Sequence, residues 1–377
     1  MARIVKRPGR FADVFSAGEV SLFQPAGVDG DGKKCYAESV MKNARLKGLI
    51  GDAKTVVMLG MCKNAGKTTA LCRLIRELAE EGGAPAALTS IGRDGESRDL
   101  VTGTDKPPIY MYEGMLAATA KELLPLSDVS REILAGTGLY TSLGEVMIFR
   151  ARSDGFVQLA GPAIVGHLEP LKEMLRGLGA GRLLIDGALS RRSPAAAAKD
   201  GAVILSTGAS LGRSMERTVM ETAYAARILC LPQEAAPGEE KGHFTLFGED
   251  KNGRPAEDLN ALQRGMGEET LLISGALTES QAAGLLRSPV RKEGLTLLAR
   301  DAGCLMLQRE TFERLSRRGV KFAVRNAVRL AAVTVNPVSA GGWHFPEDEF
   351  RERMQEAVGV SVLNVMTGEE SHDPADI

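Results

Sequence analysis

A single strand–turn–helix segment constrains the fold of this chain more than any other part of the sequence. Residues 55–59 form a continuous apolar run, which is typical of a parallel strand that is buried on both faces. Gly60 ends the run, and residues 66–81 then have the pattern of a helix, which closes at the pair Gly82-Gly83. A strand, a glycine-containing turn and a helix in this order predict the first unit of an α/β domain.

The turn between this strand and this helix reads Gly60-Met61-Cys62-Lys63-Asn64-Ala65-Gly66-Lys67-Thr68-Thr69. The first amides of a helix have no acceptor within the helix and, together with the helix dipole, attract anions. Gly66 allows a close approach of the backbone, Lys67 is expected to reach the β- and γ-phosphates of a nucleotide, and Thr68 to bind Mg²⁺. The turn therefore predicts a site for ATP and Mg²⁺. The alternative is a helix that simply opens on a Gly-Lys-Thr turn.

The residues of this turn that we expect to bind ATP are Gly60, Lys63, Asn64, Ala65, Gly66, Lys67, Thr68 and Thr69. The chain carries no Asn-Lys-x-Asp signature of guanine recognition, which favours ATP over GTP.

A magnesium nucleotide also needs an acidic group at the end of a neighbouring strand, because Mg²⁺ prefers oxygen ligands. Asp186 ends the apolar run 183–185 and is the first candidate, as a metal-binding or water-positioning residue; otherwise it caps a turn or a helix. Asp94 follows the expected strand 86–90, where related folds carry an acidic residue, and Glu96 competes with it. We expect the catalytic residues to be Lys67, Asp186 and Asp94, and the metal ligands to be Thr68 and Asp186.

Strand and helix patterns alternate along the rest of the chain, with a helix expected near residues 113–124 and a hairpin from residues 145–150 and 156–159. This alternation predicts an α/β fold, a doubly wound and mainly parallel sheet with a second α/β half. The expected divisions are an N-terminal extension (1–53), a nucleotide-binding domain (54–231), a linker or surface loop (232–268) and a C-terminal α/β region (269–377).

Composition argues against several classes of partner. The 377 residues carry a net charge of −1, so the chain has no overall attraction for nucleic acid or for an anionic membrane. The five cysteines form no C-x-x-C pair and the four histidines are scattered, which disfavours a disulfide framework or a zinc site. The basic first ten residues lack the apolar core of a signal peptide, and no run approaches the ~20 apolar residues of a membrane helix. We therefore expect a cytoplasmic protein with neither a nucleic-acid nor a membrane partner.

The loop has five residues between its two glycines, from Met61 to Ala65, where the usual spacing is four. In this it resembles the P-loop nucleoside triphosphatases (NTPases) of the dethiobiotin synthetase and cobyric acid synthase branch. The residues from Asp186 onward are similar to the acidic-Gly-Ala-Gly-Ser-Pro-Ala segment of cobyric acid synthase-like proteins. In the synthetase branch an asparagine after a late strand contacts the adenine. The resemblance therefore assigns Asn336, at the end of the apolar run 328–335, to the nucleotide site.

Lys63 invites a further comparison, with deviant P-loops whose extra lysine contacts phosphate across a dimer. That lysine lies five residues before the main lysine of the loop, whereas Lys63 lies four before Lys67. A homodimer is therefore one alternative for this chain; in the other, Lys63 is a solvated charge at the rim of the site.

Three segments together resemble a family of P-loop proteins that accompany the lysine or ornithine aminomutases, enzymes that depend on adenosylcobalamin and pyridoxal phosphate. They are the loop itself, residues 185–188, and residues 332–337 with the helical pattern that follows. The resemblance covers roughly residues 54–366. It implies an ATPase that reactivates or assists a cobalamin-dependent aminomutase as its partner, by switching between two conformations as ATP is bound and hydrolysed.

Two other kinds of function stay open. One is an ATP-dependent ligase or synthetase that phosphorylates a small carboxylate, as the dethiobiotin synthetase branch does. The other is a nucleotide-dependent scaffold with negligible turnover. An amidotransferase is disfavoured, because none of the five cysteines stands in a Gly-x-Cys-x-Gly setting.

Overall fold

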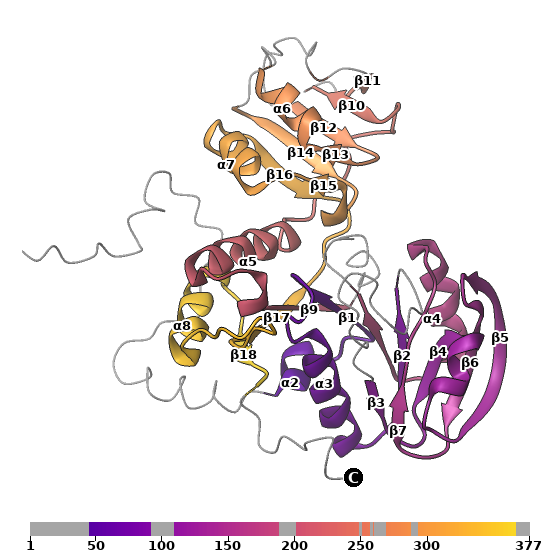
Figure 1. Cartoon of the computed structure of the whole chain (residues 1–377). Helices are drawn as coiled ribbons and strands as arrows, with labels where there is room; N and C mark the ends of the chain where they lie inside the picture. Colours follow the sequence, from indigo (N-terminus) through magenta and orange to yellow (C-terminus); the bar gives the residue numbers. More distant parts are fainter. Residues whose placement is uncertain are drawn as a thin grey trace, which may run out of the picture. The chain divides into compact units, whose positions relative to one another are not determined.

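The computed structural model of the chain describes residues 45–91, 109–187, 201–248, 251–256, 259, 269–287 and 293–366 (Figure 1). All of these residues belong to one compact unit, Met41–Ile377. The expected N-terminal extension lies almost entirely outside the described residues, and so do Asp94 and Glu96.

A nine-stranded sheet forms the centre of the unit. Its strands stand in the order β18-β17-β9-β1-β8-β2-β4-β6-β5, and all neighbouring pairs from β18 to β4 are parallel. Only β5 and β6, at one edge, run antiparallel to their neighbours. The strands are β1 (Thr55–Gly60), β2 (Ala86–Ser90), β4 (Leu116–Ala120), β5 (Arg131–Thr141), β6 (Gly144–Ala151), β8 (Arg182–Asp186), β9 (Ala202–Gly208), β17 (Leu330–Asn336) and β18 (Val362–Asn364).

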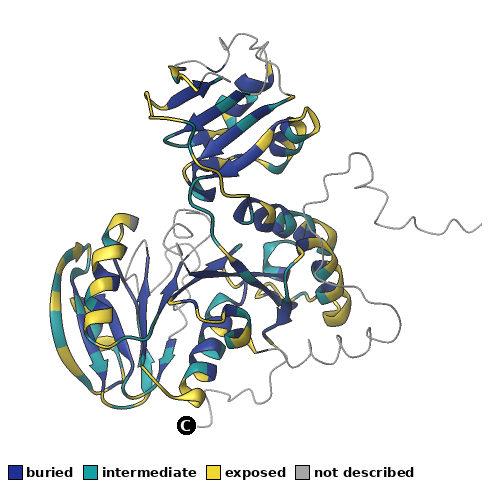
Figure 2. Ribbon diagram, turned by 180° about the vertical axis from the view of Figure 1, so that it is seen from behind, coloured by how far each residue is buried: buried dark blue, intermediate teal, exposed yellow. Residues whose placement is uncertain are grey.

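Helices cover both faces of this sheet, so its central strands β1 and β9 are buried on both sides (Figure 2). Val57 and Leu59 of β1 belong to a core that includes residues of α4 (Leu168–Gly177), α5 (Met215–Leu229) and α8 (Glu347–Val358). Val56 and Met58, which alternate with them, belong to a second core with α2 (Leu46–Ile50) and α3 (Lys67–Glu81). The expected α/β fold with a large, mainly parallel sheet is confirmed.

A second, five-stranded sheet is inserted in the chain between α5 and β17. Its order is β11-β10-β12-β14-β16, in which β12, β14 and β16 are parallel and β10 is antiparallel to both its neighbours. The strands are β10 (Phe244–Phe247), β11 (Arg254–Pro255), β12 (Glu269–Ile273), β14 (Leu295–Ala299) and β16 (Lys321–Val324), and the helices are α6 (Glu279–Arg287) and α7 (Arg309–Arg317). The short strands β13 (Leu277–Thr278) and β15 (Leu305–Met306) pair separately, as do β3 (Ile109–Met111) and β7 (Gly155–Val157). The described 3₁₀ turns are η2 (Lys121–Leu126), η3 (Val165–His167), η5 (Ala209–Leu211) and η6 (Ala302–Cys304).

The strand order corrects the division expected from the sequence. The supposed linker 232–268 contains β10 and β11, which are members of the second sheet. The expected C-terminal region 269–377 is split, because β17 and β18 return to the first sheet and extend it beyond β9. The second sheet is therefore an insertion within the chain of the first sheet, and the chain does not divide into two consecutive halves.

Two local expectations were also wrong. The helix expected near residues 113–124 is instead β4 followed by the 3₁₀ turn η2 (Lys121–Leu126), because β4 pairs with β2 on one side and β6 on the other. The hairpin expected from residues 145–150 and 156–159 does not form. Residues 145–150 lie in β6, which forms a hairpin with β5, and residues 156–157 lie in β7, which pairs with β3.

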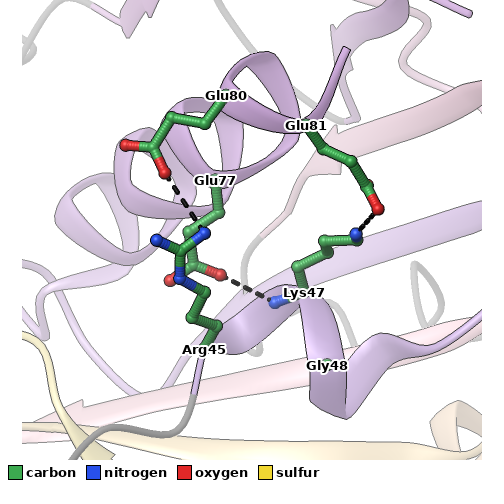
Figure 3. Close-up of a pocket in the computed structure, with 6 residues that line it drawn as sticks. All are labelled: Arg45, Lys47, Gly48, Glu77, Glu80 and Glu81. Carbon is green, nitrogen blue, oxygen red and sulfur yellow. Dashed lines mark hydrogen bonds and ion pairs between the residues drawn. The ribbon is translucent and has the colours of Figure 1, made fainter. Parts of the chain in front are cut away.

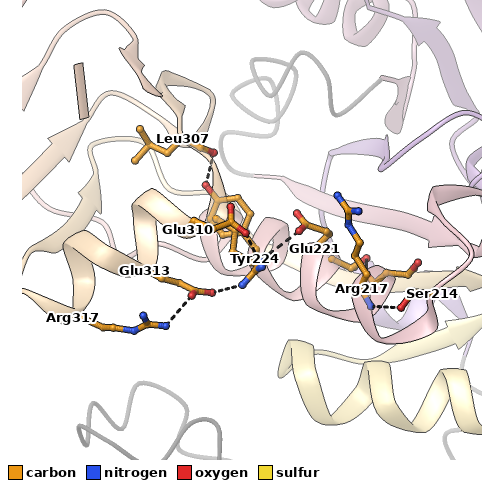
Figure 4. A network of polar contacts seen from close by, with 11 residues as sticks. Ser214, Arg217, Glu221, Tyr224, Leu307, Glu310, Glu313 and Arg317 are labelled. Atoms are coloured by element: carbon orange, nitrogen blue, oxygen red, sulfur yellow. Dashed lines mark hydrogen bonds and ion pairs between the residues drawn. The ribbon is translucent and has the colours of Figure 1, made fainter. Parts of the chain in front are cut away.

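Contacts of α5 with α7 and with the residues just before α7 join the insertion to the first sheet (Figure 4). The hydroxyl of Tyr224, on α5, donates a buried hydrogen bond of 2.7 Å to the carbonyl of Leu307. The Tyr224 ring also meets the edge of Phe312 from α7, with 5.6 Å between ring centroids. On the same two helices Arg309 pairs with Glu221 at 3.4 Å.

Replacement of Gly161 by alanine tests how closely the chain packs on the end of β2. Gly161 is buried, its amide donates to the Ser90 hydroxyl, and a Cβ atom here would overlap the Ser90 carbonyl oxygen. We expect Gly161→Ala to lower the free energy of unfolding by about 2 kcal/mol, the cost typical of overpacking, measured by urea denaturation. Gly177→Ala is the control, because a Cβ at Gly177 would meet no atom within 4 Å. Equal unfolding midpoints for the two variants would contradict the packing described.

Candidate functional site

The 60–69 loop begins at the carboxyl end of β1, an interior strand of the first sheet. Strand β1 lies between β8 and β9, and all six of its residues are buried. At the end of the strand, the Met61 amide donates a hydrogen bond of 2.8 Å to the carbonyl of Ser206 in β9. The start of the loop is therefore held by the sheet itself, at the edge where parallel α/β sheets bind ligands.

Two residues in left-handed conformations turn the loop into α3. They are Asn64, with φ of 60°, and Gly66, with φ of 84°. Gly66 precedes α3 directly, and its carbonyl accepts the first bond of the helix from the Ala70 amide at 2.9 Å. No described residue accepts a backbone hydrogen bond from the amides of Gly66 or Lys67. These amides, at the positive end of a 15-residue helix, are available to an anion.

Gly66 is required for space as well as for its backbone conformation. A Cβ atom at this position would come within 3.1 Å of the Asn336 Cβ and 3.2 Å of the Val365 Cγ2. Both neighbours lie at the ends of the adjoining strands β17 and β18, so the loop is packed against that end of the sheet.

Lys67 and Asp186 meet beside this loop. The Lys67 Nζ lies 2.5 Å from the Asp186 Oδ1, and the two side chains are 23% and 6% exposed. Asp186 ends β8, whose register against β1 pairs it with Met58. Although the two atoms form an ion pair, they lack the alignment of a hydrogen bond, so Asp186 Oδ1 has no hydrogen-bond partner among the described residues. A nearly buried carboxylate thus has one cation beside it and an acceptor that is not satisfied.

The remaining predicted residues lie along the same segment. Lys63 and Asn64 are exposed and Ala65 is buried, while in the first turn of α3 Thr68 is half-buried and Thr69 is exposed. Asn336 touches the loop directly, because its Nδ2 donates to the Asn64 carbonyl at 3.3 Å. Among the predicted catalytic residues, Lys67 and Asp186 are brought together, and Asp94 lies outside the described residues.

Sequence reasoning missed two residues that support the loop. The Ser206 carbonyl anchors Met61, and the Ser206 hydroxyl in turn accepts a buried hydrogen bond of 2.8 Å from Thr334. Val365 packs toward Gly66. The available signal was the position of each residue at the end of an apolar strand, but neither side chain has chemistry that would have singled it out.

The donor set fits Mg²⁺ better than a metal held by protein alone. Within the described part of the chain, no group of three or more His, Cys, Asp or Glu residues is arranged to hold a metal ion. Mg²⁺ in nucleotide sites typically takes only one or two protein oxygens and completes its shell with phosphates and water. The Oδ1 of Asp186 is one such oxygen, and the Thr68 hydroxyl, in the first turn of α3, is the second that the sequence predicts.

The hollow drawn in Figure 3 lies at the opposite end of α3 from the loop. It has a volume of 380 Å³ and is lined by charged side chains of α3 and of the segment around α2. Arg45 pairs with Glu80 at 3.2 Å, Lys47 pairs with Glu81, and the Lys47 amide donates to Glu77 at 2.8 Å. These charged groups pair with one another, so the hollow lies at the packing contact between α2 and α3.

The cysteines near the site are unreactive by environment. Burial raises the pKa of the Cys62 thiol, in the loop, to about 11. Burial also raises the pKa of Cys72 on α3, and the charge of Asp186 adds to this effect. A thiol with a raised pKa stays protonated at neutral pH, so neither cysteine is suited to act as a nucleophile.

Comparison of the chain with protein-family models, with curated proteins and with solved structures finds no match. Among the helices that the structure describes, none is both long and apolar enough to cross a membrane.

Alkylation of Cys62 tests the burial of the loop. A pKa of about 11 instead of 9.0 lowers the thiolate fraction at neutral pH by about a hundredfold. We expect iodoacetamide to modify Cys62 about 100 times more slowly in the folded protein than in urea. The rate in the folded protein should still rise about tenfold per unit between pH 7 and pH 9.5, followed by peptide mass spectrometry. A plateau below pH 9 would contradict the burial of this thiol.

Proposed function

We propose that this chain is a P-loop NTPase that binds ATP with Mg²⁺ on the 60–69 loop and hydrolyses its terminal phosphate. The observation that carries the proposal is the meeting of Lys67 and Asp186 at 2.5 Å, below a left-handed turn and at the ends of the adjacent parallel strands β1 and β8. A magnesium triphosphate requires a lysine, backbone amides at the start of a helix and a carboxylate; here the Gly66 and Lys67 amides and Asp186 Oδ1 have no hydrogen-bond partner among the described residues.

Each group has a separate role in this proposal. The Lys67 ammonium and the amides of Gly66 and Lys67 stabilise negative charge on the transferring phosphoryl group as water attacks in line. Thr68 and Asp186 would hold Mg²⁺, which, when bound, neutralises charge on the phosphate oxygens. Lys63, exposed on the loop, adds positive potential at the rim.

The ion pair implies an exchange of partners when the nucleotide binds. Lys67 lies against Asp186 in the structure, and it has to reach phosphate oxygens in the complex. Asp186 then loses its cation, and Mg²⁺ is the replacement that its position favours. Without the metal, the Asp186 charge opposes the approach of the triphosphate.

Replacement of Lys67 tests the proposed hydrolysis. We expect Lys67→Ala to lower the rate of ATP hydrolysis about 100-fold or more, because one preorganised charge on the transition state is lost. The rate of phosphate release is the measurement. The control is Lys54→Ala, which removes an exposed lysine just before β1. Wild-type protein that neither binds nor hydrolyses ATP would end the proposal.

Replacement of Asp186 tests the exchange of partners. In Asp186→Asn the neutral amide no longer holds Lys67 or repels phosphate, so metal-free ATP should bind about tenfold more tightly, equivalent to roughly 1.4 kcal/mol. Hydrolysis in the presence of Mg²⁺ should fall, because a metal ligand is missing. Titration calorimetry with EDTA or with Mg²⁺ measures both effects. Weaker binding of metal-free ATP by the variant would argue against a carboxylate that opposes the triphosphate.

The client of this activity is proposed on the resemblance of three segments to the aminomutase-associated family. Turnover that needs Lys67 and rises when a cobalamin-dependent aminomutase is added would support a reactivase. Turnover that needs Lys67, ignores the mutase and responds to small carboxylates would favour a ligase instead. Partner binding that depends on Lys67 without turnover would indicate a scaffold.

A further inference from the structure

Asn336 is built into the wall of the 60–69 loop. It is the last residue of β17 and stands opposite Gly208 in β9. A Cβ atom at Gly208 would overlap the Asn336 carbonyl oxygen and come 3.0 Å from its Cβ, so the glycine lets β17 approach β9 closely. The backbone pairing of β17 with β9 therefore fixes the position of Asn336, independently of its side-chain contacts.

Both ends of the Asn336 carboxamide are engaged within the protein. Its Nδ2 donates to the carbonyl of Asn64, a residue held at φ of 60°, at 3.3 Å. Its Oδ1 accepts the Val338 amide at 3.0 Å, which closes a turn directly after the strand. The carboxamide thus joins the end of β17 to the carbonyl of a left-handed loop residue.

The stem of the same side chain packs on the other left-handed residue of the loop. The Asn336 Cβ is one of the two nearest atoms that a Cβ at Gly66 would meet, at 3.1 Å. One side chain therefore contacts the loop at Asn64 by a hydrogen bond and at Gly66 by packing. These two residues set the direction of the amides that precede α3.

We infer that Asn336 is a positioning residue, which holds the 60–69 loop in its phosphate-binding conformation, and that it does not select the base of the nucleotide. This inference rests on the proposed binding of a triphosphate. Asn336 should therefore affect the binding of the phosphate chain, which ATP, GTP and inorganic tripolyphosphate share. This role replaces the adenine contact expected from the resemblance.

Two exposed apolar side chains follow the neighbouring strands β17 and β18. Val338 follows Asn336 and is 47% exposed, and Met366 follows the neighbouring strand β18 and is also 47% exposed. Apolar side chains do not distinguish the exocyclic groups of adenine and guanine, so neither residue gives a preference between the two bases.

The experiment compares three ligands on two variants. Asn336→Ala removes the bond to the loop and the turn after β17. The matched control, Asn364→Ala, removes the equivalent turn after β18, where Asn364 Oδ1 accepts the Met366 amide at 2.9 Å. The Asn364 carboxamide donates to Glu347 at 3.3 Å rather than to the loop. Titration calorimetry with the Mg²⁺ complexes of ATP, GTP and tripolyphosphate measures affinity, and urea denaturation measures stability.

We expect Asn336→Ala to weaken the binding of all three ligands by the same factor, about tenfold, since one or two hydrogen bonds are lost. Asn364→Ala should lose a similar amount of stability with less than a threefold change in affinity. A loss confined to ATP would overturn the inference, because it would mean that Asn336 reads the base. Unchanged affinity in Asn336→Ala, or equal losses in both variants, would also overturn it. Wild-type protein that binds none of the three ligands would instead contradict the proposed function itself.

Discussion

The hydrogen bonding of β1 to a parallel strand on each side is the constraint on which the site depends. Because β1 is buried at both edges and on both faces, its carboxyl end has one possible position. The Met61 amide is tied to Ser206 on one side, and the Gly187 amide is tied to Met58 on the other. The start of the loop is thus bonded to β9, and the residue after Asp186 is bonded to β1. Lys67 and Asp186 meet because these two chain segments leave adjacent strands at the same level.

The ion pair of Lys67 and Asp186 is the central charge interaction among the described residues of the site. Asp186 is only 6% exposed, and a carboxylate so deeply buried is costly unless a cation lies beside it. Lys67 supplies that cation without a hydrogen bond of good geometry, which leaves the Oδ1 of Asp186 unsatisfied. Burial also raises the pKa of Cys62, in the loop.

The insertion of the second sheet gives the edge of the site its particular form. The chain leaves the first sheet through β9 and α5 and returns to it through β17, which ends at Asn336. The strand that completes the wall of the loop is therefore separated from the loop by the whole insertion in sequence. The buried Tyr224–Leu307 bond fastens the insertion to α5, the helix that follows β9. The strands β9 and β17, which border the loop, are therefore also the strands of the first sheet between which the insertion lies in the chain.

The sequence by itself determined the parts of this protein whose structure is local. The apolar run of β1, the glycine that precedes the helix and the helix itself were predictable, because each depends on residues within a few positions of one another. The end of β8 at Asp186 was predictable for the same reason. Tertiary structure alone decided that residues 116–120, rich in alanine, form β4 and that β17 and β18 join the first sheet rather than the second. It also decided that Asn336 touches Asn64. The physical reason is that the backbone partners of a strand, and the neighbours of a side chain at its end, are chosen by packing between distant segments, and local patterns carry no record of that choice.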